Sequence, residues 1–312
     1  MLDVTMLLRS VQEWNENRIA YPDFAIDLSG AVLENANLRG ACLHGAILHR
    51  AVLAGANLQG ADLSGAYLDE ANLEAFLAGA NLQEVDLRRA RLKGAYLNGA
   101  HLEGANLQEV DLRRAHLEGA YLNGANLKGA NLEGVNLNGS HLKGADFSRS
   151  NLMSASFGPV DLSGASLKGA NLNFVNLEGA CLAGADLSGA QLEGTNLRGA
   201  ILVHANLNNT RMMFTDLQRA DLDGVDLSQG SVFWRVVLCE SNLRGANLTG
   251  RDLCEVDFRG SNLEGADLRG ANLSGANLEG VHLKGADIRY AIFIGAKTQG
   301  ADLTDVLRLE PI

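Results

Sequence analysis

The 312-residue chain has few prolines, cysteines and aromatic residues: 3 Pro, 4 Cys, and 5% Phe, Trp and Tyr. With 36 Gly beside so few Pro, the composition fits neither a flexible linker nor collagen. None of the cysteines belongs to a CxxC pair, and a chain of this length needs no disulfide framework. We therefore expect reduced thiols and a cytoplasmic setting. The cysteines are Cys42, Cys181, Cys239 and Cys254.

Long hydrophobic runs and an excess of basic residues are also missing. No run of about 18 apolar residues exists, so no transmembrane helix is expected, and the N-terminal segment lacks the apolar core of a secretory signal. Lys and Arg number 26 against 37 Asp and Glu, which gives a net charge of −11. Such a balance argues against direct nucleic-acid binding, which needs a basic face. It permits an acidic surface that binds basic partners or imitates a nucleic acid.

The chain contains a five-residue repeat with Leu at its centre. Ala, or occasionally another small or β-branched residue, lies two positions before each Leu, and Gly often lies two positions after it. A period of five fits neither a helix at 3.6 residues per turn nor a strand with period two. It fits a chain that turns a corner every five residues, with Leu and Ala pointing into a narrow interior and Gly at corners. Four corners give a square coil of about 20 residues, whose copies stack at ~4.8 Å.

Units such as ANLRG, ADLSG, ANLEG, ANLKG and ADLRG recur in near-unbroken tandem. This A(D/N)LXX pattern resembles the pentapeptide-repeat family, and the regular repeats with a helical cap are most similar to long bacterial and cyanobacterial members. The resemblance covers roughly residues 26–305. It implies an all-β solenoid, a right-handed quadrilateral β-helix of about 14 coils with a short N-terminal capping α-helix.

The ends and two irregular places set the expected domain boundaries. Residues 1–24 are expected to form the capping helix and lead-in, with a helix over 3–18 that Asp3 or Thr5 caps and that Pro22 ends. The repeats occupy 25–305, with one residue missing near Ala75 and one extra near Gly230. The tail 306–312 is expected to cap the last coil or to form a homodimer contact. The apolar faces that these predictions use are Met6, Leu7, Val11 and Trp14 in the helix, and Val306, Leu307, Leu309 and Ile312 in the tail.

Counting four units per coil places a group of outward apolar residues on one face. Such a stripe on a polar surface indicates a contact site for a partner, although scattered exposed apolar residues are also common. The pattern is most irregular nearby, between Gly230 and Glu255, where Arg251 takes an inner Ala position and Val237 and Cys239 point outward. Breaks in local rules concentrate at functional or strained sites. The candidate partner-binding residues are Met153, Phe174, Met213, Phe214, Val232 and Trp234.

A second face carries mostly acids. Two stacks of rings are expected on this face and on the adjacent one, respectively His101 with Tyr121 and His141, and Phe76 with Tyr96 and His116. Coils two apart lie too far from one another for the histidines to share a metal, so we expect stacking rather than metal binding. The candidate acidic-face residues are Asp62, Glu84, Glu103, Asp161, Asp221, Asp223 and Glu264.

No phosphate-binding loop, dinucleotide fingerprint, HExxH motif or nucleophile elbow occurs, and a Leu-filled interior leaves no substrate pocket. We therefore expect no enzyme activity and no cofactor. The leading hypothesis is a non-catalytic scaffold that binds partner proteins through the outer faces of the β-helix. The resemblance to the family suggests one alternative, a mimic of DNA that binds DNA gyrase or topoisomerase through the acidic face. A third, association with a membrane or photosynthetic complex, rests only on the similarity to cyanobacterial members.

Overall fold

The computed structural model describes residues 3–308. The chain divides into two compact units, unit 1 (Met1–Phe157) and unit 2 (Gly158–Ile312), and each is described by itself. Unit 1 begins with the helices α1 and α2, and unit 2 contains the short strands β1 and β2. No helix among the described residues is both long enough and apolar enough to cross a membrane.

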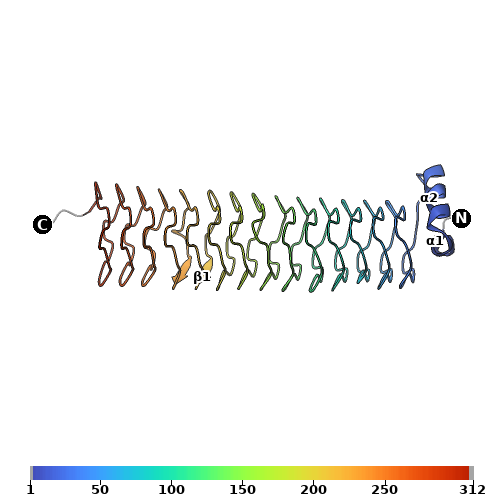
Figure 1. Ribbon diagram of the computed structural model, residues 1–312, viewed down its shortest axis with the longest axis horizontal. Coiled ribbons are helices and arrows are strands. Elements are labelled where there is room, and N and C mark those ends of the chain that lie inside the picture. The colour runs from blue at the N-terminus through green and yellow to red at the C-terminus, as the bar shows by residue number, and fades with distance from the viewer. Residues whose placement is uncertain (1–2, 309–312) are drawn as a thin grey trace. The chain divides into compact units, whose positions relative to one another are not determined.

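Both units consist of stacked coils that form a β-helix (Figure 1). Each five-residue unit is one side of a coil, and the residue before the central Leu pairs in parallel with its equivalent in the next coil. In unit 1 Asp27 pairs with Ile47, and in unit 2 Asp161 pairs with Cys181, a separation of 20 residues in both cases. Four sides of five residues therefore make one turn, which agrees with the repeat read from the sequence.

The two irregularities in the repeat change this separation by one residue each. In unit 1 Asn72 pairs with Arg91, 19 residues later, because one residue is missing near Ala75. In unit 2 Asp216 pairs with Val237, 21 residues later, because one residue is added near Gly230. The coils on either side keep their pairing, so each change is absorbed at a corner in the way a β-bulge absorbs an extra residue.

Burial follows the two inward positions of each side. The central Leu and the small residue two before it are buried, as shown by Leu43 and Ala41 at 0% exposure. Where Ser or Thr replaces the small residue, its hydroxyl in most cases donates to a backbone carbonyl, as Thr215 does to Leu192 (2.7 Å), although the buried Ser150 hydroxyl has no partner among the described residues. The Asp or Asn before the central Leu accepts a hydrogen bond from the backbone two residues on, as Asp27 does from Ser29 (2.9 Å). This last contact stabilises the turn, so the Asp and Asn residues have a structural role in the repeat.

The N-terminal segment forms two helices, α1 (Val4–Arg9) and α2 (Val11–Ala20), so the prediction of one continuous helix over 3–18 was wrong. Asp3 caps α1, as one of the two predicted caps, and Thr5 lies inside that helix. Ser10 interrupts the helix because its extended backbone makes it the N-cap of α2, with its hydroxyl accepting from the Glu13 amide (3.1 Å).

Helix α2 covers the first coil by making the hydrogen bonds that a preceding coil would make. Trp14 Nε1 donates to the carbonyl of Cys42 (2.8 Å), and the Asn15 side-chain oxygen accepts from the Cys42 amide (2.8 Å). Arg18 donates to the carbonyl of His44 (2.8 Å). Trp14 and Arg18 are almost fully buried. Helix α2 thus provides hydrogen-bond partners to the open backbone edge of the first coil and also covers the apolar end of that coil.

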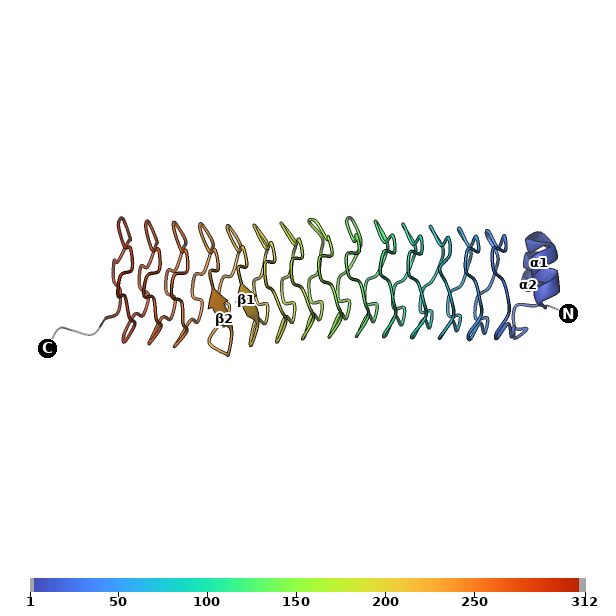
Figure 2. The ribbon, with the colours of Figure 1, turned by 90° about the horizontal axis from the view of Figure 1, so that it is seen from below.

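Unit 2 contains the strands β1 (Arg211–Met213) and β2 (Val232–Trp234), which pair in parallel on consecutive coils (Figure 2). At its other end the ladder continues to Leu307, which pairs with Asp287. Leu307 is 53% exposed, and Val306 is partly buried. Leu309 and Ile312, the other two predicted tail residues, lie outside the described residues.

Candidate functional site

Five of the six predicted partner-binding residues lie on one face of unit 2. Successive pairs Asn171–Gln191, Gln191–Arg211 and Arg211–Val232 align four consecutive coils, and the residues lie on the first, third and fourth of them. We call this group the aromatic ridge: Phe174, Met213, Phe214, Val232 and Trp234. The three aromatic residues and Val232 are 43–60% exposed, whereas Met213 is half-buried. The sixth residue, Met153, belongs to unit 1 and is half-buried there.

The rings of the ridge contact one another and the backbone. Phe214 and Trp234 stack in a tilted arrangement, with ring centroids 4.8 Å apart and planes at 58°. The Arg235 guanidinium lies 5.6 Å from the Trp234 ring centroid, a cation–π geometry. The Phe174 ring lies over Gly194, where an added Cβ would come within 2.7 Å of it. Gly194 therefore gives the Phe174 ring its place on the coil surface.

Three residues of this region occupy corners that most repeats fill with Gly. The backbone φ is +59° at Phe174, +54° at Phe214 and +52° at Arg235. A bulky side chain in this left-handed region is a conformational outlier that costs on the order of 1 kcal/mol or more. The large exposed fraction of the two Phe rings means that burial within unit 2 returns only part of that cost. Strain retained at exposed aromatic residues favours a binding role over a packing role.

The framework beneath the ridge is fixed by buried hydrogen bonds. Thr195 and Thr215 are fully buried, and each donates its hydroxyl to a backbone carbonyl of the preceding coil, at Leu172 (2.8 Å) and Leu192 (2.7 Å). These residues replace the usual Ala, and their bonds tie together the coils that carry the aromatic residues. Such bonds hold a binding surface in one conformation before a partner arrives.

The corner near Gly230 favours glycine because its backbone φ is positive and the Asn209 side chain lies close to it. Gly230 has φ +61°, and an added Cβ would overlap the side-chain oxygen of Asn209 on the preceding coil. Ser231 follows with its hydroxyl donating to Leu207 (2.8 Å). The corner is therefore closely packed, and it leads directly into β2 with Val232 and Trp234 facing outward.

The predicted outward positions of Cys239 and Val237 do not make these two residues fully exposed. Cys239 lies on the outer side of its coil but is only 8% exposed, because the Arg259 side chain of the next coil covers it, with Nη2 3.9 Å from Sγ. Val237 is half-buried as well. Burial raises the pKa of the Cys239 thiol to about 11, so it is not a reactive nucleophile. Arg251 does not enter the interior despite its inner position, since it stays half-exposed and donates to the Thr249 carbonyl (3.4 Å).

The acidic-face residues are divided between the units, and several are already engaged. In unit 1 the Asp62 carboxylate accepts hydrogen bonds from the Ser64 hydroxyl (2.7 Å) and the Asn81 amide (3.0 Å). In unit 2 Asp221 accepts from Asn242 (2.8 Å), and Glu264 lies 4.0 Å from Arg244. Glu84 and Glu103 line a shallow pocket of unit 1, and Asp161 and Asp223 lie exposed in unit 2. These contacts reduce the negative field that the acids present to solvent.

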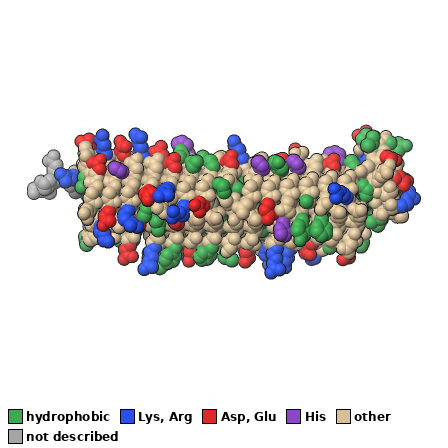
Figure 3. Space-filling view, in the orientation of Figure 1, with side chains coloured by type: hydrophobic (Ala, Val, Ile, Leu, Met, Phe, Trp, Pro, Cys, Tyr) green, Lys and Arg blue, Asp and Glu red, His purple; other side chains and the backbone are tan. Residues whose placement is uncertain are grey.

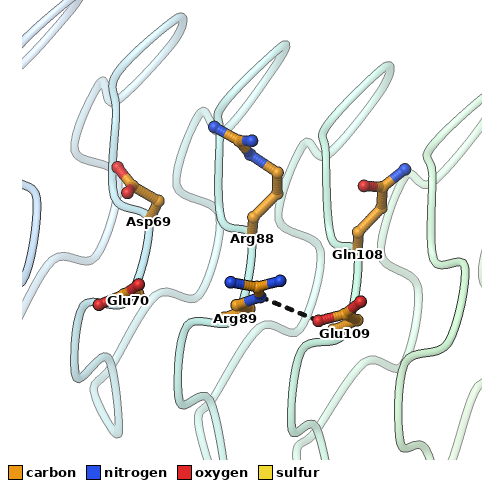
Figure 4. A pocket seen from close by; sticks show the side chains of 6 residues that line it. All are labelled: Asp69, Glu70, Arg88, Arg89, Gln108 and Glu109. Atoms are coloured by element: carbon orange, nitrogen blue, oxygen red, sulfur yellow. Dashed lines mark hydrogen bonds and ion pairs between the residues drawn. The ribbon is translucent and has the colours of Figure 1, made fainter.

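A second pocket, of about 180 Å³, lies among the side chains of three consecutive coils of unit 1 (Figure 4). Its acids and bases are paired: Glu70 with Arg50 (2.7 Å), Arg89 with Glu109 (2.9 Å), and Arg88 with Asp86 (2.7 Å). Alternating, paired charges leave little net field for a ligand. We assign no site to this pocket. Its lining residues are Asp69, Glu70, Arg88, Arg89, Gln108 and Glu109.

The two predicted ring ladders in unit 1 are confirmed. His101 and His141 stack on opposite faces of Tyr121, with centroid distances of 4.6 and 4.5 Å. Phe76, Tyr96 and His116 stack in the same way at 5.1 and 4.6 Å. Within residues 3–308 no group of three or more potential ligands is placed to hold a metal ion.

Charged side chains of both signs are interspersed over the face that Figure 3 shows, in both units. Two arginines that matter for the ridge, Arg211 and Arg235, were not among the residues predicted from the sequence. Both are exposed, and Arg235 contacts Trp234 directly. Arg211 could have been identified from the sequence, because it lies immediately before Met212 and therefore aligns with Val232 on the next coil.

Comparisons with known proteins agree with this architecture. The family described as "Pentapeptide repeats (8 copies)" matches in overlapping and adjacent segments that extend from residue 26 to residue 305. No curated protein matches the chain. Similar solved structures include HetL, a pentapeptide repeat protein involved in heterocyst differentiation regulation from the cyanobacterium Nostoc sp. strain PCC 7120. The HetL sequence is 29% identical to this one, and the match covers 94% of each of the two chains, with a TM-score of 0.20.

Two other solved structures are more distant in sequence. QnrB1, a plasmid-mediated fluoroquinolone resistance protein, is 22% identical over 67% of this chain and 89% of its own, with a TM-score of 0.32. Rfr23 from the cyanobacterium Cyanothece 51142 is 20% identical over 57% and 90%, with a TM-score of 0.14. Scores this low carry no argument about function. The family match covers nearly the whole repeat region and agrees with the parallel pairing of the coils, so this chain belongs to the pentapeptide-repeat family.

Proposed function

We propose that this chain is a non-catalytic, cytoplasmic scaffold that binds a partner protein through the aromatic ridge of unit 2. The observation that supports it best is the exposure of Phe174 and Phe214 at corners where their backbone is strained. Exposed aromatic residues on a rigid framework are the usual anchors of protein interfaces. We propose that the β-helix is right-handed and has about 14 coils, a number obtained by dividing the length of the repeat region by the length of one coil.

The proposal predicts that removing two ring anchors abolishes partner capture. The tagged wild type and the double variant Phe214→Ala, Trp234→Ala would be used in parallel to capture proteins from extracts of the source organism, with quantitative mass spectrometry as the readout. Loss of a hot-spot aromatic residue costs about 2 kcal/mol or more, which is ~30-fold in affinity. At least one protein captured by the wild type should therefore disappear from the variant.

The matched control is Phe76→Ala, Tyr96→Ala, a stacked and exposed ring pair in unit 1. It removes similar aromatic area from the same fold and should leave capture unchanged. If both double variants capture the same proteins as the wild type, the ridge is not the anchor. Far-UV circular dichroism of each variant checks that the coils remain folded.

The alternative function, in which the chain imitates DNA and binds a gyrase or topoisomerase, has less support. Asp62, Asp221 and Glu264 are engaged by neighbouring side chains, and the acids are much sparser than the phosphates of a duplex. A gyrase supercoiling assay tests this alternative: inhibition or protection at micromolar protein would support it over the ridge.

The C-terminal end of unit 2 is a candidate homodimer contact as well as a candidate cap. Tyr290, Ile294 and Leu307 are more than half exposed there. We propose only that this end is available, because the ridge carries the stronger argument. Sedimentation equilibrium of the wild type would decide between a monomer and a dimer.

A further inference from the structure

We infer that the ridge recognises a protein segment in which an apolar anchor lies next to one or two carboxylates. This inference rests on the proposed function, since it specifies the chemistry of the partner at the same site. It follows from the charges that surround Trp234, where two arginines without an ion-pair partner among residues 3–308 lie beside exposed apolar and aromatic residues. The relevant groups are two arginines close to the rings, Glu193 on the coil between Phe174 and Met213, and Glu255 on the coil after Trp234.

The two arginines at the centre of the ridge have no ion-pair partner within the described residues. Arg211 is exposed at the start of β1, directly beside Val232 of β2. Arg235 is exposed and lies over the Trp234 ring at 5.6 Å. An unpaired guanidinium against an aromatic face is ready to form a bidentate bond with a carboxylate without losing an existing pair.

Arginines just outside the ridge, in contrast, form ion pairs with nearby carboxylates. Arg198 pairs with Asp216 (3.3 Å), and Arg219 pairs with Glu240 (2.7 Å). The chain therefore supplies carboxylates to the guanidiniums that flank the ridge but not to the two within it. A partner carboxylate would fill the same role at Arg211 and Arg235.

Acids on the coils next to β1 and β2 limit how much negative charge a partner can carry. Glu193 is half-buried one coil before Met213, and Glu255 is exposed one coil after Arg235, without an ion pair to it. Asp252 already accepts hydrogen bonds from the Cys254 amide and the Asn272 side chain, both at 3.3 Å. A long run of acids would meet these carboxylates, whereas one or two next to the anchor would meet only the arginines.

A phage-displayed library of random twelve-residue peptides tests the inference. The full chain is immobilised, bound phage are sequenced, and the double variant Phe214→Ala, Trp234→Ala serves as the subtractive control. We expect enrichment of Leu, Phe or Trp with Asp or Glu one or two positions away. Enriched apolar peptides without adjacent acids, or with adjacent Lys and Arg, would overturn the inference and leave the proposed function standing. No enrichment over the double variant would overturn both.

Charge reversal gives a second, independent measurement. Fluorescence anisotropy with the most enriched peptide should show ~30-fold weaker binding to Arg211→Glu, Arg235→Glu, the loss typical of a removed interface charge pair. The matched control is Arg91→Glu, Arg114→Glu. Arg91 precedes a central Leu as Arg211 precedes Met212, and Arg114 is a corner residue with positive φ like Arg235. Equal binding to both double variants would show that the arginines do not select the partner.

Discussion

At the scale of single residues, the corner position decides how this fold can carry side chains outward. Most corners are Gly with φ near +65°, and the remaining corners force an ordinary residue into the same conformation. Polar residues such as Asn tolerate that conformation more readily than bulky ones. Phe174, Phe214 and Tyr290 are therefore corners where a strained backbone carries an exposed aromatic ring.

Replacing Phe174 by glycine should stabilise unit 2. Gly removes the cost of a positive φ and loses little burial, since Phe174 is 60% exposed. We expect the free energy of unfolding to rise by about 1 kcal/mol, measured by urea titration with circular dichroism. Phe174→Ala is the matched control, because it deletes the ring and keeps the strained backbone. If Phe174→Gly is no more stable than Phe174→Ala, the corner is not strained.

At the scale of elements, α2 shows how a helix can terminate a parallel coil. A β-helix that begins abruptly leaves backbone groups without partners, and parallel pairing with a helix is geometrically impossible. Side chains solve the problem here: the Asn15 amide carries a donor and an acceptor at the spacing of a peptide group. It donates to the Gly40 carbonyl (2.9 Å) and accepts from the Cys42 amide.

Asn15→Ala should loosen the first coil. The substitution leaves two backbone groups of that coil without partners, at a cost of about 1–3 kcal/mol. Hydrogen exchange followed by mass spectrometry should show faster exchange in the segment that contains Cys42. Exchange in unit 2 should not change, since cooperativity in solenoids extends mainly to neighbouring repeats. The control is Gln12→Ala, which removes an exposed side-chain bond to Glu16 on the same helix and should have no effect.

The sequence predicted the coil, both register changes and the five ridge positions in unit 2, because each depends only on counting residues in a repeat. It did not predict the break between α1 and α2, because Ser10 can lie inside a helix or cap one, and the contact with the coil decides. It also missed the burial of Cys239, since that depends on how the Arg259 side chain lies across the neighbouring coil. Contacts between coils 20 residues apart are set by rotamers, which a pentapeptide pattern does not encode.

At the scale of the whole molecule, repeated Asp–Arg pairs reduce the local repulsion among the acids of a chain whose net charge is −11. The same two-residue spacing occurs in both units, with Arg113 beside Asp111, and Arg269 and Arg289 beside Asp267 and Asp287. In each case the arginine hydrogen bond is the main reason that the pKa of the aspartate lies below its ordinary 3.8.

Acid should therefore destabilise the protein in a defined range. A lowered pKa in the folded state means that the contribution of each pair is complete above pH 3.8 and is lost as the pH falls below it. We expect the urea midpoint to be constant between pH 7 and about 5 and to decrease below about 4. The triple variant Asp111→Asn, Asp267→Asn, Asp287→Asn should show a weaker decrease.

That variant is a close control because Asn at this position still accepts the backbone hydrogen bond of the turn, as Asn131 does from Glu133 (3.2 Å). Only the charge and its arginine partner are lost. An equally steep acid transition in the variant would mean that other carboxylates control it.

Because residues 20 apart pair on neighbouring coils, the direction in which a side chain faces depends on its position within a 20-residue turn. Within unit 2, deleting one pentapeptide between Phe174 and Phe214 would set every later residue back by a quarter turn relative to Phe174. Phe174 and Phe214 would then face different directions, although every repeat still matched the family pattern. Deleting four pentapeptides would restore the alignment and bring the two rings onto closer coils. In this fold the length of an insertion, taken modulo 20, decides whether a binding surface survives.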